Sequence, residues 1–194
     1  MQTTHEHDEI ELRNLSSVSD VLAYWNTQDV SGILEFYDDA ITWRNVAMER
    51  TYQGKDAVGA FLAELMAAFP DLQFDVVSRL ARGDFVAEEW SLRGTHRGPF
   101  MGIPPTGRRV EIPGMSLVKL SDGRFVGDQF YFDSGLVLRQ LGLLPPLAVL
   151  ESRLGRGILW LLVNRMALLR GLAIGAAAAL IGRLTWRIHR GHVS

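Results

Sequence analysis

Four consecutive segments with strand composition most constrain what this 194-residue chain can fold into. They cover residues 72–79, 85–96, 108–120 and 124–133, and short stretches rich in Gly, Asp and Pro separate them. The Asp122-Gly123 pair before the last segment predicts a tight hairpin, because both residue types tolerate the positive φ of such turns. A run of strands joined in this way disfavours the strand–helix alternation of Rossmann-like folds.

The chain before residue 72 carries mostly helical patterns. Val18, Val21, Leu22 and Trp25 recur at helical spacing, residues 30–37 suit a second short helix, and residues 41–44 are typical of a strand. The strongest stripe follows Gly54 and stops at Pro70: Val58, Phe61, Leu62, Leu65, Met66 and Phe69. Helices followed by strands predict an α+β fold, in which one curved antiparallel sheet wraps around the N-terminal helices and leaves a concave pocket.

The alternation of side chains along a strand indicates which residues share a face of this sheet. Gln129, Tyr131 and Asp133 share a face of the last strand, and Trp90 and His96 share a face of the 85–96 strand. If these faces line the pocket, a carboxylate and an imidazole enter one apolar cavity. The two groups are the minimum for general acid–base catalysis, because burial can raise the pKa of an aspartate toward neutral pH.

Several short motifs lie in the second half of the chain. They are Gly94-Thr95-His96, Pro105-Thr106-Gly107-Arg108, Asp122-Gly123 and Gln140-Leu141-Gly142, with Asp133 before the last of them. In this order and spacing they closely resemble the SnoaL-like polyketide cyclase family, over roughly residues 15–145. The helical first half matches in pattern only. The resemblance implies the cone of the nuclear transport factor 2-like superfamily, a curved antiparallel sheet wrapped around helices.

The resemblance also implies a chemistry for Asp133. In the cyclases, the aspartate seven residues before the Gln of Gln-Leu-Gly is the general acid/base of an intramolecular aldol ring closure, and Asp133 precedes Gln140 by this spacing. No metal or cofactor takes part in that reaction. The cyclases also place a Gln and a His in the strand before the Asp-Gly turn, where this chain has Gly114 and Ser116. We therefore expect polar assistance to be missing from that wall of the pocket.

Asp133 and His96 are the predicted catalytic residues, and each has a structural alternative. Asp133 can instead cap the helix that follows it, and His96 can fix the loop 98–107. The candidate substrate-binding residues are Trp25, Trp43, Asn45, Trp90, Ser116, Gln129 and Tyr131. Asn45 enters this set through the resemblance, and the aromatic members also suit an ordinary core or pocket wall.

Composition excludes several other classes of function. The chain has no cysteine, which removes disulfides, Cys-ligated metals and thiol nucleophiles and fits a reducing compartment. Residues 1–144 hold 13 Lys and Arg against 21 Asp and Glu, so this part lacks the basic surface that nucleic acid requires. The acidic start has no pattern of a secretion signal, so we expect a cytoplasmic protein. We expect residues 1–14 to be a disordered leader, with His5 and His7 in solvent rather than on a metal.

The end of the chain has the opposite charge. Residues 145–194 hold seven Arg and one acid, Glu151, and the uninterrupted apolar stretch 171–182 has 12 residues, against about 20 needed to span a bilayer. We expect residues 146–194 to be a basic, apolar helical tail. Residues 156–190 suit the anionic inner surface of a membrane, and packing on the protein's own domain or on a second copy in a homodimer stays open.

Three functions remain open on the sequence. The first, which the sequence favours, is a SnoaL-like enzyme that acts on a hydrophobic carbonyl compound through Asp133, without metal or cofactor. The second is a non-catalytic protein that binds an apolar ligand in the same cone and attaches to a membrane or partner through its tail. The third is isomerase or epoxide hydrolase chemistry, which needs a further acid or polar group in the pocket, and Glu88 is a candidate.

Overall fold

The computed structural model describes residues 2–158, 160–161 and 164, and the chain divides into two compact units, Met1–Leu144 and Pro145–Ser194. The first unit contains α1 (Gln2–Thr27), α2 (Val30–Glu35), β1 (Tyr37–Asn45), β2 (Arg50–Gln53), α3 (Gly54–Ala68), β3 (Gln73–Arg82), β4 (Phe85–Thr95), β5 (Arg109–Ser121), β6 (Arg124–Phe132) and α4 (Ser134–Gln140). The second contains α5 (Leu147–Glu151).

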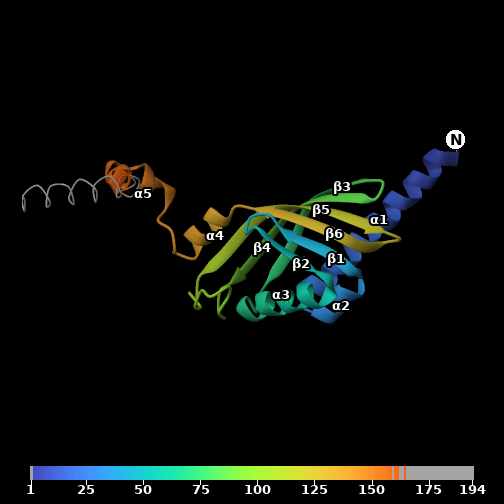
Figure 1. The fold of residues 1–194 in the computed structure, drawn as a ribbon, viewed down its shortest axis with the longest axis horizontal. Coiled ribbons are helices and arrows are strands. Elements are labelled where there is room, and N and C mark those ends of the chain that lie inside the picture. Colours follow the sequence, from blue (N-terminus) through green and yellow to red (C-terminus); the bar gives the residue numbers. More distant parts are fainter. Residues whose placement is uncertain (1, 159, 162–163, 165–194) are drawn as a thin grey trace, which may run out of the picture. The chain divides into compact units, whose positions relative to one another are not determined.

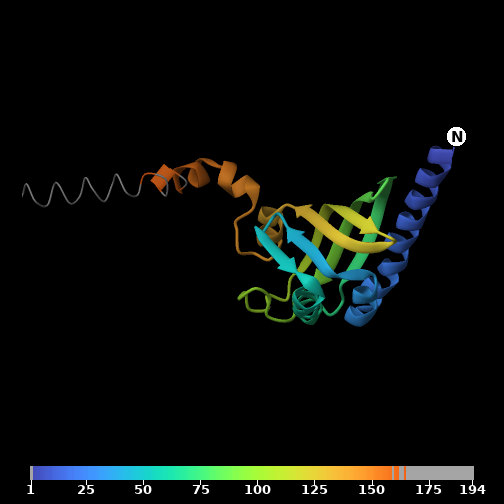
Figure 2. The same cartoon turned by 45° about the vertical axis from the view of Figure 1, so that its right-hand side comes forward.

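The six strands form one curved, open sheet in the order β2-β1-β6-β5-β4-β3. Neighbouring strands run antiparallel except β1 and β6, which are parallel. Helices α2 and α3 lie on the same side of this sheet (Figure 1), and the turned view shows the strands curving around that side (Figure 2). The predicted α+β fold, with a curved sheet around helices, is confirmed, and the parallel pair makes the sheet mixed.

The predicted stripe of α3 forms much of the core. Its members are all buried: Val58, Phe61, Leu62, Leu65, Met66 and Phe69. They pack with buried residues of α1 and of the concave face of the sheet, among them Val18, Val86 and Val118. The helix ends at Ala68, just before Pro70, because the residue that precedes a proline is disfavoured in helical conformation. One apolar core therefore joins the helices to the sheet.

Helix α1 begins at Gln2 and includes residues that the sequence predicted to be a leader outside the domain. Two of their side chains hold the turn between β3 and β4. Glu11 Oε1 accepts a hydrogen bond from the Gly83 backbone N–H over 2.9 Å, and Asn14 Nδ2 donates one to the Gly83 carbonyl over 3.0 Å. The apolar pattern that starts at Val18 could not indicate this contact, since both side chains that make it are polar.

The predicted hairpin between β5 and β6 is present, but a β-bulge follows it. Strand β6 has one extra residue, Val126, between the residues that pair with Leu120 and Lys119 of β5. The bulge interrupts the two-residue alternation, so that Phe125 and Asp128, three positions apart, are both buried on the inner face. From Asp128 onward, the inward and outward faces of β6 are the reverse of those predicted.

In the second unit, residues 153–158 are helical after α5. Several of its apolar side chains are exposed: Leu147, Val149, Leu154, Ile158, Trp160 and Leu161. Within the described part of the chain, no helix is long and apolar enough to cross a membrane. Most of the predicted membrane-binding stretch 156–190 lies outside the described residues, so membrane contact through the tail stays a prediction, as does the homodimer.

Candidate functional site

A cavity of about 450 Å³ lies against the concave face of the sheet in the first unit. Its wall is formed by α1, α3, α4, the loop 98–107 and all six strands. The wall is mostly apolar and includes many aromatic rings, among them Trp25, Trp43, Phe61, Phe69, Phe74 and Trp90. A volume of this size and an apolar wall are typical of sites for small organic ligands.

A row of polar side chains crosses the sheet side of this cavity. It consists of Arg79 on β3, Glu88 on β4, Ser116 on β5, Asp128 on β6 and Trp43 on β1, and we call it the polar row. Arg79 lies opposite Glu88 in the strand register, and Glu88 lies opposite Ser116. Asp128 lies opposite Trp43 and is offset by two positions from the partner of Ser116. The sheet therefore brings two carboxyl groups and a hydroxyl into one apolar cavity.

Asp128 is the buried acid of the polar row. Trp43 Nε1 donates a hydrogen bond to its Oδ2 over 2.9 Å, whereas its buried Oδ1 has no hydrogen-bond partner among the described residues. Burial raises the pKa of Asp128 to about 7; the neighbouring Glu88 adds to this rise, and the Trp43 hydrogen bond opposes it. A carboxyl group with such a pKa can take up and release a proton near neutral pH.

Glu88 is the second carboxyl group, and an ion pair holds it in place. Arg79 Nε donates to Glu88 Oε2 over 2.8 Å, and the same guanidinium donates to Ser19 Oγ over 2.8 Å and to the Val18 carbonyl over 3.2 Å. Burial raises the pKa of Glu88, while Arg79 opposes this by favouring the carboxylate. Arg79 therefore ties α1 to the sheet at the edge of the cavity and fixes the Glu88 carboxylate.

Ser116 receives a hydrogen bond from a tryptophan that passes beneath β5. Trp90 Nε1 donates to Ser116 Oγ over 3.0 Å, in a buried position. The ring fits because residue 114, opposite Trp90 in the register, is a glycine, and a Cβ there would overlap the indole. The wall that was expected to lack polar assistance thus presents a serine hydroxyl, although the Gln and His of the cyclases are absent.

The structure places Asp133 outside the cavity. Its side chain is 60% exposed and caps α4, since Oδ1 accepts a hydrogen bond from the Leu136 backbone N–H over 2.9 Å. Oδ2 pairs with Arg139 at 3.1 Å, and the pKa of Asp133 is lowered, mainly by the hydrogen bond from Leu136. The bulge at Val126 is the reason, because it turns the predicted face of β6 outward. Helix capping, the structural alternative, is what the geometry shows.

His96 also lies outside the cavity wall. It is fully buried and stacks on Phe69 with ring centroids 5.1 Å apart. Its Nδ1 accepts a hydrogen bond from the Thr106 backbone N–H over 3.3 Å and lies 3.2 Å from Thr106 Oγ1. Burial lowers the pKa of His96, which favours the neutral ring. These contacts fix the loop 98–107, as the structural alternative for this residue expected.

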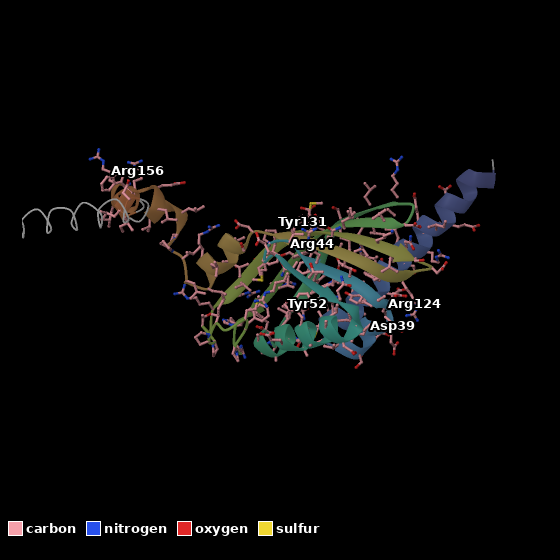
Figure 3. The ribbon with its side chains drawn as sticks, in the orientation of Figure 1. Asp39, Arg44, Tyr52, Arg124, Tyr131 and Arg156 are labelled. Carbon is pink, nitrogen blue, oxygen red and sulfur yellow. The ribbon has the colours of Figure 1, made fainter. Side chains whose placement is uncertain are left out.

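The candidate binding residues divide between the two faces of the sheet. Five of them line the cavity: Trp25, Trp43, Asn45, Trp90 and Ser116. The buried Asn45 accepts a hydrogen bond from the Met48 backbone N–H over 3.1 Å. Gln129 and Tyr131 do not line the cavity, for the same reason as Asp133. Figure 3 shows Tyr131, which is 46% exposed, on the side of the sheet away from α3.

The sequence reasoning missed Asp128 as a candidate, although a signal was present. Phe125 and Phe130 are both large and apolar, yet their odd separation prevents them from sharing one face of a regular strand. Two such residues in one strand indicate a bulge between them, and a bulge brings Asp128 to the face of both. Arg79 had no local signal, because its contacts with Val18 and Ser19 join segments about 60 positions apart.

Among the described residues, no three His, Asp or Glu side chains lie close enough together to hold a metal ion.

Comparisons with known proteins agree with the fold. Residues 18–141 match the family model described as SnoaL-like polyketide cyclase, and no curated protein matches the chain. AclR from Streptomyces galilaeus, proposed to be a hydroxylase, is 29% identical over 70% of this chain and 99% of its own, with a TM-score of 0.62. A Jannaschia sp. CCS1 protein, proposed to be a SnoaL-like polyketide cyclase, is 27% identical over 70% and 96%, with a TM-score of 0.64. IdmH from Streptomyces antibioticus, proposed to be a polyketide cyclase, is 25% identical over 66% and 98%, with a TM-score of 0.58.

Proposed function

Because the chain belongs to the SnoaL-like polyketide cyclase family, we propose that it catalyses proton transfer on a hydrophobic carbonyl compound, with Asp128 as general acid and base. One observation carries the proposal. The Asp128 carboxyl group lines an apolar cavity with Oδ2 held by Trp43 and Oδ1 without a partner among the described residues. One oxygen is thus fixed, and the other is free to exchange a proton with a bound molecule.

The expected reaction needs only this group and the substrate. Asp128 Oδ1 takes a proton from a carbon next to a carbonyl group, and the C–H electron pair becomes an enolate. The enolate carbon then attacks a second carbonyl carbon of the same molecule, a ring closes, and the protonated Asp128 returns its proton to the new alkoxide. Because burial raises the pKa of Asp128 to about 7, both forms that this cycle uses are populated near neutral pH.

Isomerisation is the second candidate, and Glu88 favours it. Here the proton that Asp128 removes returns to a different carbon of the same substrate, and no ring forms. Such chemistry was expected to need a further acid or polar group in the pocket, and Glu88 lines the same cavity. The negative charge of Glu88 adds to the rise of the Asp128 pKa, so the two carboxyl groups are near enough to interact.

The cavity supports a hydrophobic substrate. Its wall consists mainly of aromatic and aliphatic side chains, and a volume of about 450 Å³ is within the range of sites that enclose small organic ligands. The aromatic rings suit a planar or fused-ring compound, because stacking and edge contacts add to the burial of apolar surface. The proposed cycle returns Asp128 to its starting state, so it consumes no co-reactant.

Asp128→Asn tests the proposal, with Asp133→Asn as its matched control. The assay is the exchange of protons next to the carbonyl of fused-ring aryl ketones in deuterated water, followed by proton NMR. We expect Asp128→Asn to lose the catalysed exchange, because the amide is not a base at neutral pH. We expect Asp133→Asn to retain it, because Asn can still cap α4.

Two results would contradict this function. Equal loss in both variants would show that Asp128 has no special role. Ketone binding without exchange by the unchanged protein, measured by tryptophan fluorescence, would favour the non-catalytic binding protein instead.

A further inference from the structure

We propose that the Ser116 hydroxyl donates a hydrogen bond to the substrate oxygen that becomes negatively charged when Asp128 removes a proton. This inference rests on the proposed function. It assigns the cavity a second catalytic residue and requires that the substrate carbonyl be seated between Ser116 and Asp128. Trp90 and Gly114 are positioning residues in this assignment.

The position of Ser116 within the polar row is the first argument. It is buried on β5 and lines the cavity, with Glu88 opposite it on β4 and Asp128 on the adjoining β6. Diagonal neighbours on one face of adjacent strands lie roughly 7–8 Å apart, with their Cβ atoms somewhat closer, so one ligand oxygen can contact both side chains. The Ser116 side chain also lowers the pKa of Asp128 by hydrogen bonding, so the two groups lie close together.

The hydrogen bonds at Ser116 run in a direction that suits a donor to the ligand. Its oxygen accepts from Trp90 Nε1 over 3.0 Å, which uses one of its lone pairs. A hydroxyl that already accepts is a stronger donor, because hydrogen bonds in series polarise one another. The Ser116 hydroxyl also lowers the pKa of Asp128 by hydrogen bonding, and its proton can turn from that carboxyl group to a ligand oxygen.

Gly114 is the residue that gives Trp90 its place beside Ser116. Gly114 leaves room for the indole beneath β5, and any side chain at this position would push the ring away from Ser116. Without the hydrogen bond from the indole N–H, the Ser116 oxygen could accept hydrogen bonds from groups inside the cavity. Gly114, Trp90 and Ser116 therefore act together to present one oriented donor.

The charge movement of the reaction fits this donor. The C–H electron pair moves into the enolate, the proton goes to Asp128 Oδ1, and the negative charge moves from the carboxylate to the substrate oxygen. A hydroxyl that lies near both can follow the charge by rotating about its C–O bond, and the Ser116 proton is not transferred. The hydrogen bond is then stronger in the transition state than with the bound ketone, so it accelerates the step.

The test measures catalysis and binding in Ser116→Ala, with Ser121→Ala, an exposed serine of the same strand, as its control. Catalysis is the exchange of the protons next to the 1-indanone carbonyl. We expect Ser116→Ala to lower kcat about 10²-fold with KM changed by less than about twofold, and Ser121→Ala to change neither. We expect the acidic limb of the pH profile to move to higher pH in Ser116→Ala, because Ser116 lowers the pKa of Asp128.

The second measurement does not depend on turnover. 2-Naphthol carries an aryl hydroxyl that mimics an enol, and its own fluorescence reports binding. We expect Ser116→Ala to bind it about 10-fold more weakly, Trp90→Phe to bind it several-fold more weakly, and Ser121→Ala to bind it normally.

The outcomes separate this inference from the proposed function. Unchanged kcat and unchanged naphthol affinity in Ser116→Ala overturn the role of Ser116, and so does a failure of the unchanged protein to bind naphthol. Loss of exchange in Asp128→Asn together with normal exchange in Ser116→Ala leaves the proposed function in place and removes the donor. Normal exchange in Asp128→Asn removes the proposed function itself.

Discussion

Trp43 and Asp128 are joined by a buried hydrogen bond across the parallel β1–β6 pair, from the indole Nε1 to Oδ2 over 2.9 Å. The bond orients the carboxyl group and leaves Oδ1 without a hydrogen-bond partner among the described residues. It also favours the carboxylate and so opposes the burial that raises the pKa of Asp128 to about 7. The balance between these two effects keeps the proposed base active near neutral pH.

Trp43→Phe should therefore shift the pH profile of catalysis. The substitution keeps an aromatic ring in the cavity wall and removes the N–H that stabilises the Asp128 carboxylate. We expect the pKa of Asp128 to rise, and the acidic limb of kcat/KM to move up by about 1–2 pH units, since a hydrogen bond to a charged group contributes roughly 1.5–3 kcal/mol. The ketone exchange assay, repeated between pH 5 and 9, measures the position of this acidic limb. Trp25→Phe, which changes another indole of the wall, should leave the limb in place; equal shifts in both variants would contradict the role of Trp43.

The stability of the folded protein should fall as the pH rises from about 4 to 7. The pKa of Asp128 is about 7 in the folded protein against the ordinary value of 3.8, so in this window the folded state holds a proton that the unfolded state has lost. This contribution to stability is fully present below the pKa that Asp128 has in the unfolded state. It is lost as the pH rises through the pKa that Asp128 has in the folded state. Its size is on the order of 4 kcal/mol. Urea unfolding at pH 5 and pH 8 should show the difference in the unchanged protein and a much smaller one in Asp128→Asn, whose amide does not titrate. Equal pH dependence in both would contradict the buried acid.

The elements of the fold could be predicted because their signals are local. The α3 stripe from Val58 to Phe69 repeats with the period of a helix, and the Asp122-Gly123 pair carries the backbone conformation of its turn, with φ of 50° and 76°. The face of β6 could not be read from alternation alone. Because of one extra residue, Val126, Asp128 faces the cavity and Asp133 does not, although the strand itself was predicted correctly.

Gly114→Ala should disturb the core more than Gly127→Ala. Both glycines lie in central strands, but a Cβ at 114 would overlap the Trp90 ring, whereas one at 127 would lie 3.7 Å from its nearest neighbour, an ordinary contact. We expect Gly114→Ala to lower the free energy of unfolding by about 1–3 kcal/mol, as overpacking does, and to change the tryptophan emission. Gly127→Ala should stay within about 1 kcal/mol. Urea unfolding followed by tryptophan fluorescence measures both, and similar losses in the two variants would show that Trp90 is not confined by residue 114.

Asn14→Ala should loosen the first half of α1. The Asn14 side chain is buried and donates to the Gly83 carbonyl, so its loss leaves that carbonyl without the partner. We expect a loss of about 1 kcal/mol in the free energy of unfolding and faster hydrogen exchange in residues 2–14. Ser16→Ala, an exposed change on the same helix, is the control. Slow exchange in the Asn14→Ala variant would show that other contacts hold this part of α1.

Residues 145–194 should bind anionic membranes through their charge. This segment holds seven Arg and one Glu, and its described part exposes Leu154, Ile158 and Trp160. Basic residues near an anionic surface each contribute about 1 kcal/mol, and salt screens this attraction, while the apolar side chains enter the interface. We expect the full chain to float with vesicles that contain phosphatidylglycerol, to float less at 0.5 M salt, and not to float with phosphatidylcholine alone.

A chain that ends at Leu144, the last residue of the first compact unit, should stay at the bottom of the gradient while its circular dichroism remains that of a folded α+β protein. Equal flotation of the two chains would place any membrane contact in the first unit, whose excess of acidic residues opposes an anionic surface.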